Sequence, residues 1–356
     1  MNVNIMLKSN TVEIGCYFPD NWTYGQYEQA MAKNIISQIN NKFSLQKNLF
    51  INMTWFGPQF NNEYNQVLKF KEQGIKFDNL FLLATVDPPM ITSEQIQAIA
   101  AASGVSAIYQ IGNFDSNYEF NFFAIVCAEK FVKYKIGDII LKDPKHLYIN
   151  YNRKPRKHRV DFVKQLIKHN LIDQGIVTLG RPNVIFDKSD DNNLYLTIGE
   201  DPADYVEQGH WFNGPDEFGI PHDLFSLHNI DYWQHHFLHI CGSTEFNSWD
   251  NIFVNQIEFK PLIGLRPFVI NGQTTIYQWL QRNGFKTFNH YFDAELENIP
   301  EHQIHNSIIA VIKQLSNLDH SELISMYNDM LPDLLHNRRR FFEFAQEQHY
   351  KLNNLF

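Results

Sequence analysis

The sequence contains few cysteines, no long apolar run and no secretory leader pattern. Its three cysteines among 356 residues, Cys16, Cys127 and Cys241, are scattered and odd in number. This argues against a disulfide framework and a zinc site, and it favours a reducing compartment. No apolar run approaches the roughly 20 residues needed to cross a bilayer, and the first residues lack the order of a signal peptide. We therefore expect a cytoplasmic protein with no membrane span.

Positive charge and phosphate-binding motifs are also scarce. The net charge is −9, with 30 Lys and Arg against 39 Asp and Glu. A protein that coats nucleic acid needs an excess of Lys and Arg, because these side chains release the counterions of the phosphates. Neither standard glycine-rich phosphate loop occurs, and no serine nucleophile elbow. Nucleic acid is not expected as a partner, and an anion would have to be bound by another arrangement.

The sequence does contain alternating strand and helix patterns, over a length that favours two domains. This alternation predicts an α/β protein with parallel sheets. We expect two Rossmann-like lobes, at residues 1–140 and 141–300, and a helical C-terminal tail at residues 301–356 that packs across both. Strands are expected at residues 14–18, 49–54, 79–86, 105–111, 147–151, 175–179, 237–241, 267–270 and 286–288. Helices are expected at residues 24–43, 61–73, 92–102, 121–134, 156–169, 274–282, 301–316 and 321–356, with a linker at 135–145.

Residues 237–273 form the unit around which the second lobe is organised. An apolar run meets a polar turn, an amphipathic segment ends at Lys260 and Pro261, and a second apolar run stops at Asn271. This is the pattern of a strand, a helix and a parallel strand. Because ligands of open parallel sheets bind beyond the carboxyl ends of the strands, we expect a ligand near residues 243–245 and 271–273.

A basic turn follows the strand expected at residues 147–151. Arg153, Arg156 and Arg159 lie between a strand end and a helix start, where free backbone N–H groups and the helix dipole favour an anion. A diphosphate is the natural candidate, since Arg makes bidentate contacts to phosphate. The alternative is a solvated basic turn in an acidic protein.

Other polar clusters carry weaker signals. His235, His236 and His239 invite comparison with metal ligands, but a spacing of three in a strand does not put two rings on one face, and no Cys or carboxylate completes the set. In the insertion at residues 201–222, Asp216, Glu217 and His222 could supply a general base; a solvated acidic loop is the alternative. No metal site is expected, and the terminal helices could serve an oligomer contact.

The second half also carries a recognisable order of short motifs. In chain order these are the turn Asn150-Tyr-Asn-Arg-Lys-Pro-Arg, then Thr244-Glu245-Phe246, Lys260-Pro-Leu-Ile-Gly-Leu-Arg-Pro-Phe268, Asn271-Gly272 and Asn283-Gly-Phe-Lys-Thr-Phe288. Over residues 146–295 this order resembles the donor-binding half of fucosyltransferase-like and exostosin-like glycosyltransferases, in particular those encoded by tailed phages. The resemblance implies a GT-B fold, with a nucleotide-sugar donor on the second lobe and the acceptor on the first. It also implies inverting transfer without a metal or other cofactor.

The resemblance assigns roles to residues that match the family pattern. The donor-binding candidates are Asn152, Arg153, Arg156, Arg159, Glu245, Gln256, Lys260, Asn271 and Gly272. The catalytic candidates are Glu245, Asp216 and His222.

The sequence departs from the family pattern at two charged motifs. The family shows Glu-Thr-Glu before the helix and Thr-Glu-Lys at its start, where this chain has Ser243-Thr-Glu245 and Asn255-Gln-Ile257. Loss of a transition-state electrostatic partner typically costs about two to three powers of ten in rate. Two hypotheses follow: a glycosyltransferase that transfers a sugar to a saccharide acceptor, or a catalytically degenerate relative that serves as a phage structural or interaction protein.

These hypotheses imply different partners and places. The enzyme would act in the host cytoplasm on a nucleotide sugar and a small saccharide or surface glycan. The degenerate protein would keep a homo-oligomer or virion partner. Modified phage DNA as an acceptor is disfavoured, because the first lobe shows no Lys/Arg stripe and the net charge is negative.

Overall fold

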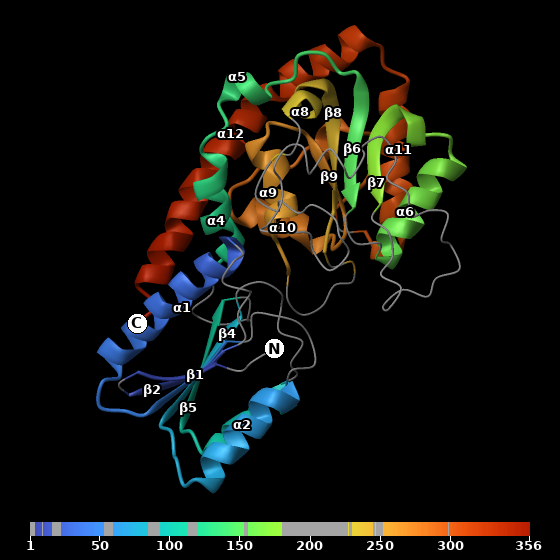
Figure 1. Cartoon of the computed structure of the whole chain (residues 1–356). Coiled ribbons are helices and arrows are strands. Elements are labelled where there is room, and N and C mark those ends of the chain that lie inside the picture. The colour runs from blue at the N-terminus through green and yellow to red at the C-terminus, as the bar shows by residue number, and fades with distance from the viewer. Residues whose placement is uncertain are drawn as a thin grey trace. The chain divides into compact units, whose positions relative to one another are not determined.

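The computed structural model describes most of the chain, and the chain divides into two compact units (Figure 1). The described residues are 4–8, 10–15, 23–52, 60–84, 93–112, 120–152, 156–179, 227, 230–244, 246, 252–297 and 299–356. The first unit comprises residues 1–125 and 345–356, and the second comprises residues 126–344.

Each unit contains a sheet with four parallel strands and flanking helices, so the expected α/β class with parallel sheets and a C-terminal helix is confirmed. The first sheet has the order β1-β2-β3-β4-β5, in which β1 is antiparallel to β2 and the others are parallel. The second sheet is parallel throughout, with the order β7-β6-β8-β9.

The elements of the first sheet and its helices follow the predicted alternation closely. They are β1 (Asn4–Lys8), β2 (Thr11–Gly15), α1 (Thr23–Lys42), β3 (Asn48–Asn52), α2 (Phe60–Glu72), β4 (Asn79–Ala84), α3 (Ser93–Ser103), β5 (Ala107–Gly112) and α4 (Phe122–Phe131). β1 has no counterpart among the expected strands. It pairs with β2 from Lys8 opposite Thr11 to Asn4 opposite Gly15.

The elements that follow build the second sheet. They are α5 (Ile136–Ile139), β6 (His146–Asn152), α6 (Lys157–Lys168), β7 (Gly175–Leu179), α8 (Ile230–His235), β8 (His236–Gly242), α9 (Gln256–Ile263), β9 (Phe268–Asn271), α10 (Thr275–Arg282), α11 (Ile304–Ser316) and α12 (His320–Asn353). Short 3-10 turns lie at Ile172–Gln174, Asn289–Tyr291 and Glu301–Gln303. The expected linker at 135–145 thus contains the short helix α5, and the long insertion at 201–222 lies outside the described residues.

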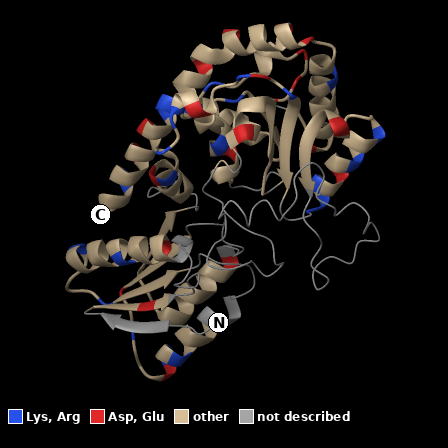
Figure 2. Cartoon of the chain, turned by 45° about the horizontal axis from the view of Figure 1, so that its top comes forward, with Lys and Arg blue, Asp and Glu red and all other residues tan. Residues whose placement is uncertain are grey.

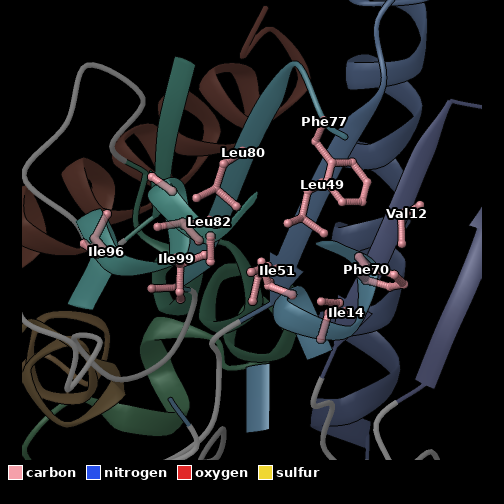
Figure 3. Packing of buried hydrophobic residues seen from close by; sticks show 14 residues of the cluster. Val12, Ile14, Leu49, Ile51, Phe70, Phe77, Leu80, Leu82, Ile96 and Ile99 are labelled. Carbon is pink, nitrogen blue, oxygen red and sulfur yellow. The ribbon is translucent and has the colours of Figure 1, made fainter. Parts of the chain in front are cut away.

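Aliphatic side chains on one face of the first sheet pack against α2 and α3 (Figure 3). Leu49, Ile51, Leu80 and Leu82 alternate along β3 and β4 on this face. Burial of such side chains away from water is the main favourable term in folding. The remaining members are Val12, Ile14, Val67, Phe70, Phe77, Ala84, Ile96, Ile99, Ala100 and Ala102.

The opposite face of the first sheet is aromatic and is closed by the C-terminal residue. Phe81 stacks on Tyr109 with ring centroids 4.7 Å apart, and Phe43, which follows α1, meets Phe81 at 5.3 Å. Phe356 packs edge-on against Phe43 at 5.5 Å and against Phe81 at 5.6 Å. The last residues of the chain therefore complete the core of the first unit.

Helices cover both faces of the second sheet, with α9 and α10 on one side and α6 and α11 on the other (Figure 1). None of the residues of β6 to β9 is Lys, Arg, Asp or Glu, and Figure 2 shows these strands in tan, with the coloured charges of the second unit on its helices and loops. Continuous apolar strands are typical of parallel sheets buried on both faces. On the α9 side, the Phe259 ring packs 5.1 Å from that of Phe341 in α12.

The short strand expected at residues 286–288 is wrong. These residues form no strand, and the backbone hydrogen bonds of Lys286 go to a side chain. The Lys286 N–H donates to Asn337 Oδ1 at 2.7 Å, and Asn337 Nδ2 donates to the Lys286 carbonyl at 2.9 Å. Asn337 is fully buried in α12, so one amide side chain takes the place of a neighbouring strand.

Across the described part of the chain, no helix has both the length and the apolar character needed to cross a membrane.

Candidate functional site

Three neighbouring strands of the second sheet end in register at its carboxyl edge. Gly242, the last residue of β8, pairs with Asn271, the last residue of β9. β6 pairs with β8 through Ile149 and His239, and each strand has three more residues, which bring Asn152 level with Gly242. From β6 the chain first adds β7 on one side of β6, and it then adds β8 and β9 on the opposite side of β6. The strand order thus reverses between β6 and β8, the place where open α/β sheets bind ligands.

Gly242 allows the β6 and β8 ends to approach closely. A Cβ atom on Gly242 would lie 2.4 Å from Asn152 Oδ1, a separation that no real side chain tolerates. Asn152 Nδ2 donates to Asn150 Oδ1 at 2.5 Å, and Asn150 Nδ2 donates to the Ile240 carbonyl at 3.0 Å. Two buried amides therefore form a chain along the end of β6, and any side chain at position 242 would have to displace the Asn152 amide.

A buried carboxylate fixes the segment that links β8 to α9. Ser243 Oγ donates to Glu258 Oε1 at 2.6 Å, and the Asn255 N–H donates to Glu258 Oε2 at 3.0 Å. Asn255 Oδ1 in turn accepts from the Ile257 N–H at 2.8 Å, which completes a capping box at the start of α9. Burial raises the pKa of the Glu258 carboxyl, and these hydrogen bonds oppose the shift. Glu258 was not predicted as a site residue, although the Asn-x-x-Glu spacing is a signature of this cap.

The basic side chains at the start of α6 reach the carboxyl edge but hold backbone carbonyls there. Arg159 Nη2 donates to the carbonyls of Gly242 at 2.8 Å and Ser243 at 2.9 Å. The Arg156 guanidinium donates to the carbonyl of Thr244. Both residues were predicted to bind a donor phosphate. The structure brings them to the edge and gives their guanidinium groups a positioning role toward the chain leaving β8.

His158 joins the same carbonyl contacts as a neutral ring. Its Nε2 lies 3.0 Å from the Ser243 carbonyl, and a carbonyl only accepts, so Nε2 carries the proton. Burial, followed by the charge of Arg159, lowers the pKa of His158 to about 3. The ring also stacks on Phe246 with centroids 5.0 Å apart. His158 therefore anchors the residues beyond β8 without contributing charge near neutral pH.

Three amide side chains near this edge keep polar atoms without a partner in the part of the protein that the structure describes. Among the described residues, no hydrogen bond reaches Asn152 Oδ1, Gln256 Oε1 or either polar atom of Asn271. All three residues are buried, and buried amides without partners cost free energy unless water or a ligand satisfies them. The oxygens of Asn152 and Gln256 can accept hydrogen bonds, and the Asn271 amide can both donate and accept, a combination suited to hydroxyl groups.

The remaining predicted residues are placed differently. Gly272 follows β9 directly and is buried. Lys260, only 8% exposed, lies deeper along α9, where its charge adds to the effect of burial in lowering the pKa of His239. The prediction had listed Lys260 among the donor-binding residues. Ile257, at the family's Lys position, is half-buried. Arg153, Asp216, His222 and Glu245 lie outside the described residues.

The histidine-rich segment differs from its prediction. The rings of His236 and His239 were expected on different faces, yet their centroids lie 5.7 Å apart. His236 is the first residue of β8 and follows α8 directly, so strand alternation does not control its direction. Within the described ranges, no group of three or more His, Cys, Asp or Glu side chains is placed to hold a metal ion.

The sequence was also compared with known proteins. No protein-family model matches the chain, and no curated protein matches it.

Proposed function

We propose that the protein is a glycosyltransferase-like protein of GT-B type, which binds a nucleotide sugar at the carboxyl edge of the second sheet. The observation that carries this proposal is the group of buried amides of Asn152, Gln256 and Asn271, which keep polar atoms without a partner among the described residues. Asn152 ends β6, beside the reversal of strand order, and Asn271 ends β9, the strand beyond β8. Amides that donate and accept suit the hydroxyl groups of ribose and sugar rings. The resemblance of residues 146–295 to donor-binding halves supports the same ligand.

In this proposal the enzyme transfers the sugar to a saccharide acceptor with inversion and without a metal. Arg156 and Arg159 hold the carbonyls that follow β8, so their positive charges lie beside the edge where a diphosphate would leave. A charge positioned before the reaction stabilises developing negative charge without reorganisation. The two arginines would then act mainly by orienting the ligand-binding segment and by their field.

Ligand-dependent thermal stability tests the binding step. A ligand that binds only the folded protein stabilises it by mass action, so one member of a panel of nucleoside diphosphates and nucleotide sugars is expected to raise the melting temperature. Asn271→Leu removes the unpartnered amide at similar volume, and we expect it to abolish the shift. Gln278→Leu, on the exposed side of α10, serves as the control and should keep it. Absence of a shift with every member of the panel would overturn the proposal.

A specific observation favours a second candidate, a catalytically degenerate protein that keeps the ligand site. Ile257 occupies the position of the family's Lys, and the nearest arginines already donate to backbone carbonyls. Such a protein would serve as a phage structural or interaction component with a stable partner or oligomer. It predicts ligand-induced stabilisation with no release of nucleoside diphosphate from any donor; measurable turnover of one donor would exclude it. Mass spectrometry of purified particles tests a virion role.

A further inference from the structure

A second polar cluster lies at the opposite, amino-terminal edge of the second sheet. Trp233 stacks on His239 and meets His236 edge-on, with ring centroids 5.0 Å apart in both pairs. Arg266 precedes β9, and its guanidinium lies 5.5 Å from the centre of the Tyr327 ring. All five side chains are buried. The cluster shares no residue with the carboxyl-edge site.

Arg266 is the feature of this cluster that needs explanation. Its side chain is fully buried, and burial lowers its pKa only to about 10, so it remains charged near neutral pH. Nη1 donates to the carbonyl of Leu265 at 2.7 Å and to Tyr327 Oη at 3.3 Å. Within the described part of the chain, Nε and Nη2 have no hydrogen-bond partner, and the ion pairs found there do not include Arg266. A buried charge is normally paired, because its desolvation is costly.

The two histidines supply further polar atoms without adding charge. Burial is the main cause that lowers the pKa of both rings. The charge of Arg266 adds to it at His236, and the charges of Lys260 and then Arg266 add to it at His239. His236 Nδ1 lies 2.8 Å from the Tyr232 carbonyl and therefore carries the proton. His236 Nε2 and His239 Nδ1 have no partner among the residues that the structure describes. Two neutral rings thus lie near the charged Arg266 guanidinium, whose Nε and Nη2 groups have no hydrogen-bond partner in the described part of the chain.

We propose that this cluster is an internal binding site for a small monovalent anion of halide size, held by Nε and Nη2 of Arg266 and by Nδ1–H of His239. The anion acts as the negatively charged partner of the Arg266 guanidinium. The Trp233 ring closes the site. A water molecule could satisfy the same hydrogen bonds, but it would leave the guanidinium charge uncompensated. Bound internally, the anion belongs to the folded state and stabilises it.

Linkage between anion and folding gives the first test. At concentrations well above the dissociation constant, a tenfold rise in free chloride is expected to raise the folding equilibrium constant about tenfold. Urea denaturation in sodium chloride, matched in ionic strength with sodium gluconate, measures this change. Arg266→Met should abolish the difference between the two salts, whereas Arg339→Met, which removes a guanidinium that is 70% exposed, should retain it. Equal stability of the wild-type protein in both salts would overturn the proposal.

A second measurement needs no variant, in case Arg266→Met fails to fold. Crystals of the wild-type protein grown in sodium bromide are expected to show an anomalous scattering peak within hydrogen-bond distance of the Arg266 guanidinium. Density for water alone, or for a carboxylate of this chain beside Arg266, would refute the anion site. The outcome is independent of nucleotide-sugar binding at the other edge of the sheet.

Discussion

Asn152 lies directly against Gly242, so that a Cβ atom on the glycine would stand 2.4 Å from Asn152 Oδ1. The contact joins the last residues of β6 and β8 at the place where the strand order reverses. It links the backbone of one strand to an amide of the proposed ligand site. A change at position 242 should therefore disturb both stability and binding.

The first prediction concerns Gly242→Ala. The added methyl group must displace the Asn152 amide, and overpacking of this kind costs about 1 to 3 kcal/mol. We expect the variant to unfold at lower urea concentration and to lose the ligand-induced shift in melting temperature. Gly137→Ala is the matched control, because a Cβ there meets no atom within 4 Å. Full ligand binding by Gly242→Ala would show that the Asn152 amide lies outside the site.

The location of this edge was predictable from the sequence. The apolar runs of β8 and β9 and the polar residues after them placed Ser243 and Asn271 at the ends of parallel strands. The strand order around β6 was not readable, because sequence patterns do not reveal which strands pair. That order is what brings Asn152 beside Gly242.

The detailed partners could not be predicted, because they depend on tertiary contacts. The arginines of the basic turn were expected to face a phosphate, and no pattern in the sequence shows that they meet carbonyls of residues 242–244, more than 80 positions away. The same holds for Lys286. Residues 286–288 were expected to form a strand, and the sequence does not show that Asn337 of α12 accepts and donates the backbone hydrogen bonds of Lys286.

The second prediction concerns the pH dependence set by Glu258. Burial is the first cause that raises its pKa in the folded state above the ordinary value of 4.5. The folded protein thus keeps a proton that the unfolded chain has released, and stability falls as pH rises from about 4.5 through the folded-state pKa. Glu258→Gln removes the titration, while its amide can still accept from Asn255 and donate to Ser243. Urea denaturation across this window should show a flatter profile for Glu258→Gln. An unchanged profile, equal to that of the exposed control Glu295→Gln, would contradict the prediction.

The third prediction concerns the hydroxyl of Tyr327 in α12. Tyr327 Oη accepts from the Leu141 N–H at 3.3 Å and from Arg266 Nη1 at 3.3 Å. It also donates to the Leu265 carbonyl at 3.1 Å. Tyr327→Phe removes the acceptor of the buried Leu141 N–H and one of the acceptors of Arg266 Nη1, and we expect a loss of about 1 to 3 kcal/mol in the free energy of unfolding. In Tyr291→Phe the lost bond is an exposed one to the Asp329 carbonyl, so little change is expected. If Tyr327→Phe and Tyr291→Phe lowered the free energy of unfolding equally, burial of the lost hydrogen bonds would not determine the size of the effect.

The fourth prediction concerns the C-terminal residue and the first unit. Phe356 packs edge-on against Phe43, Phe81 and Tyr109, with centroids 5.5 to 6.1 Å apart. Because Phe356 is half-buried, Phe356→Ala should cost less than the 3 to 5 kcal/mol of a fully buried Phe, about 2 kcal/mol. Amide exchange should become faster, most of all in β3, β4 and β5, since these strands carry or flank the ring cluster. Tyr350→Ala, a residue 70% exposed in α12, removes similar apolar volume outside the cluster and should leave exchange unchanged. Hydrogen exchange followed by mass spectrometry separates the two outcomes: faster exchange confined to the second unit, or none, would mean that Phe356 does not stabilise the first sheet.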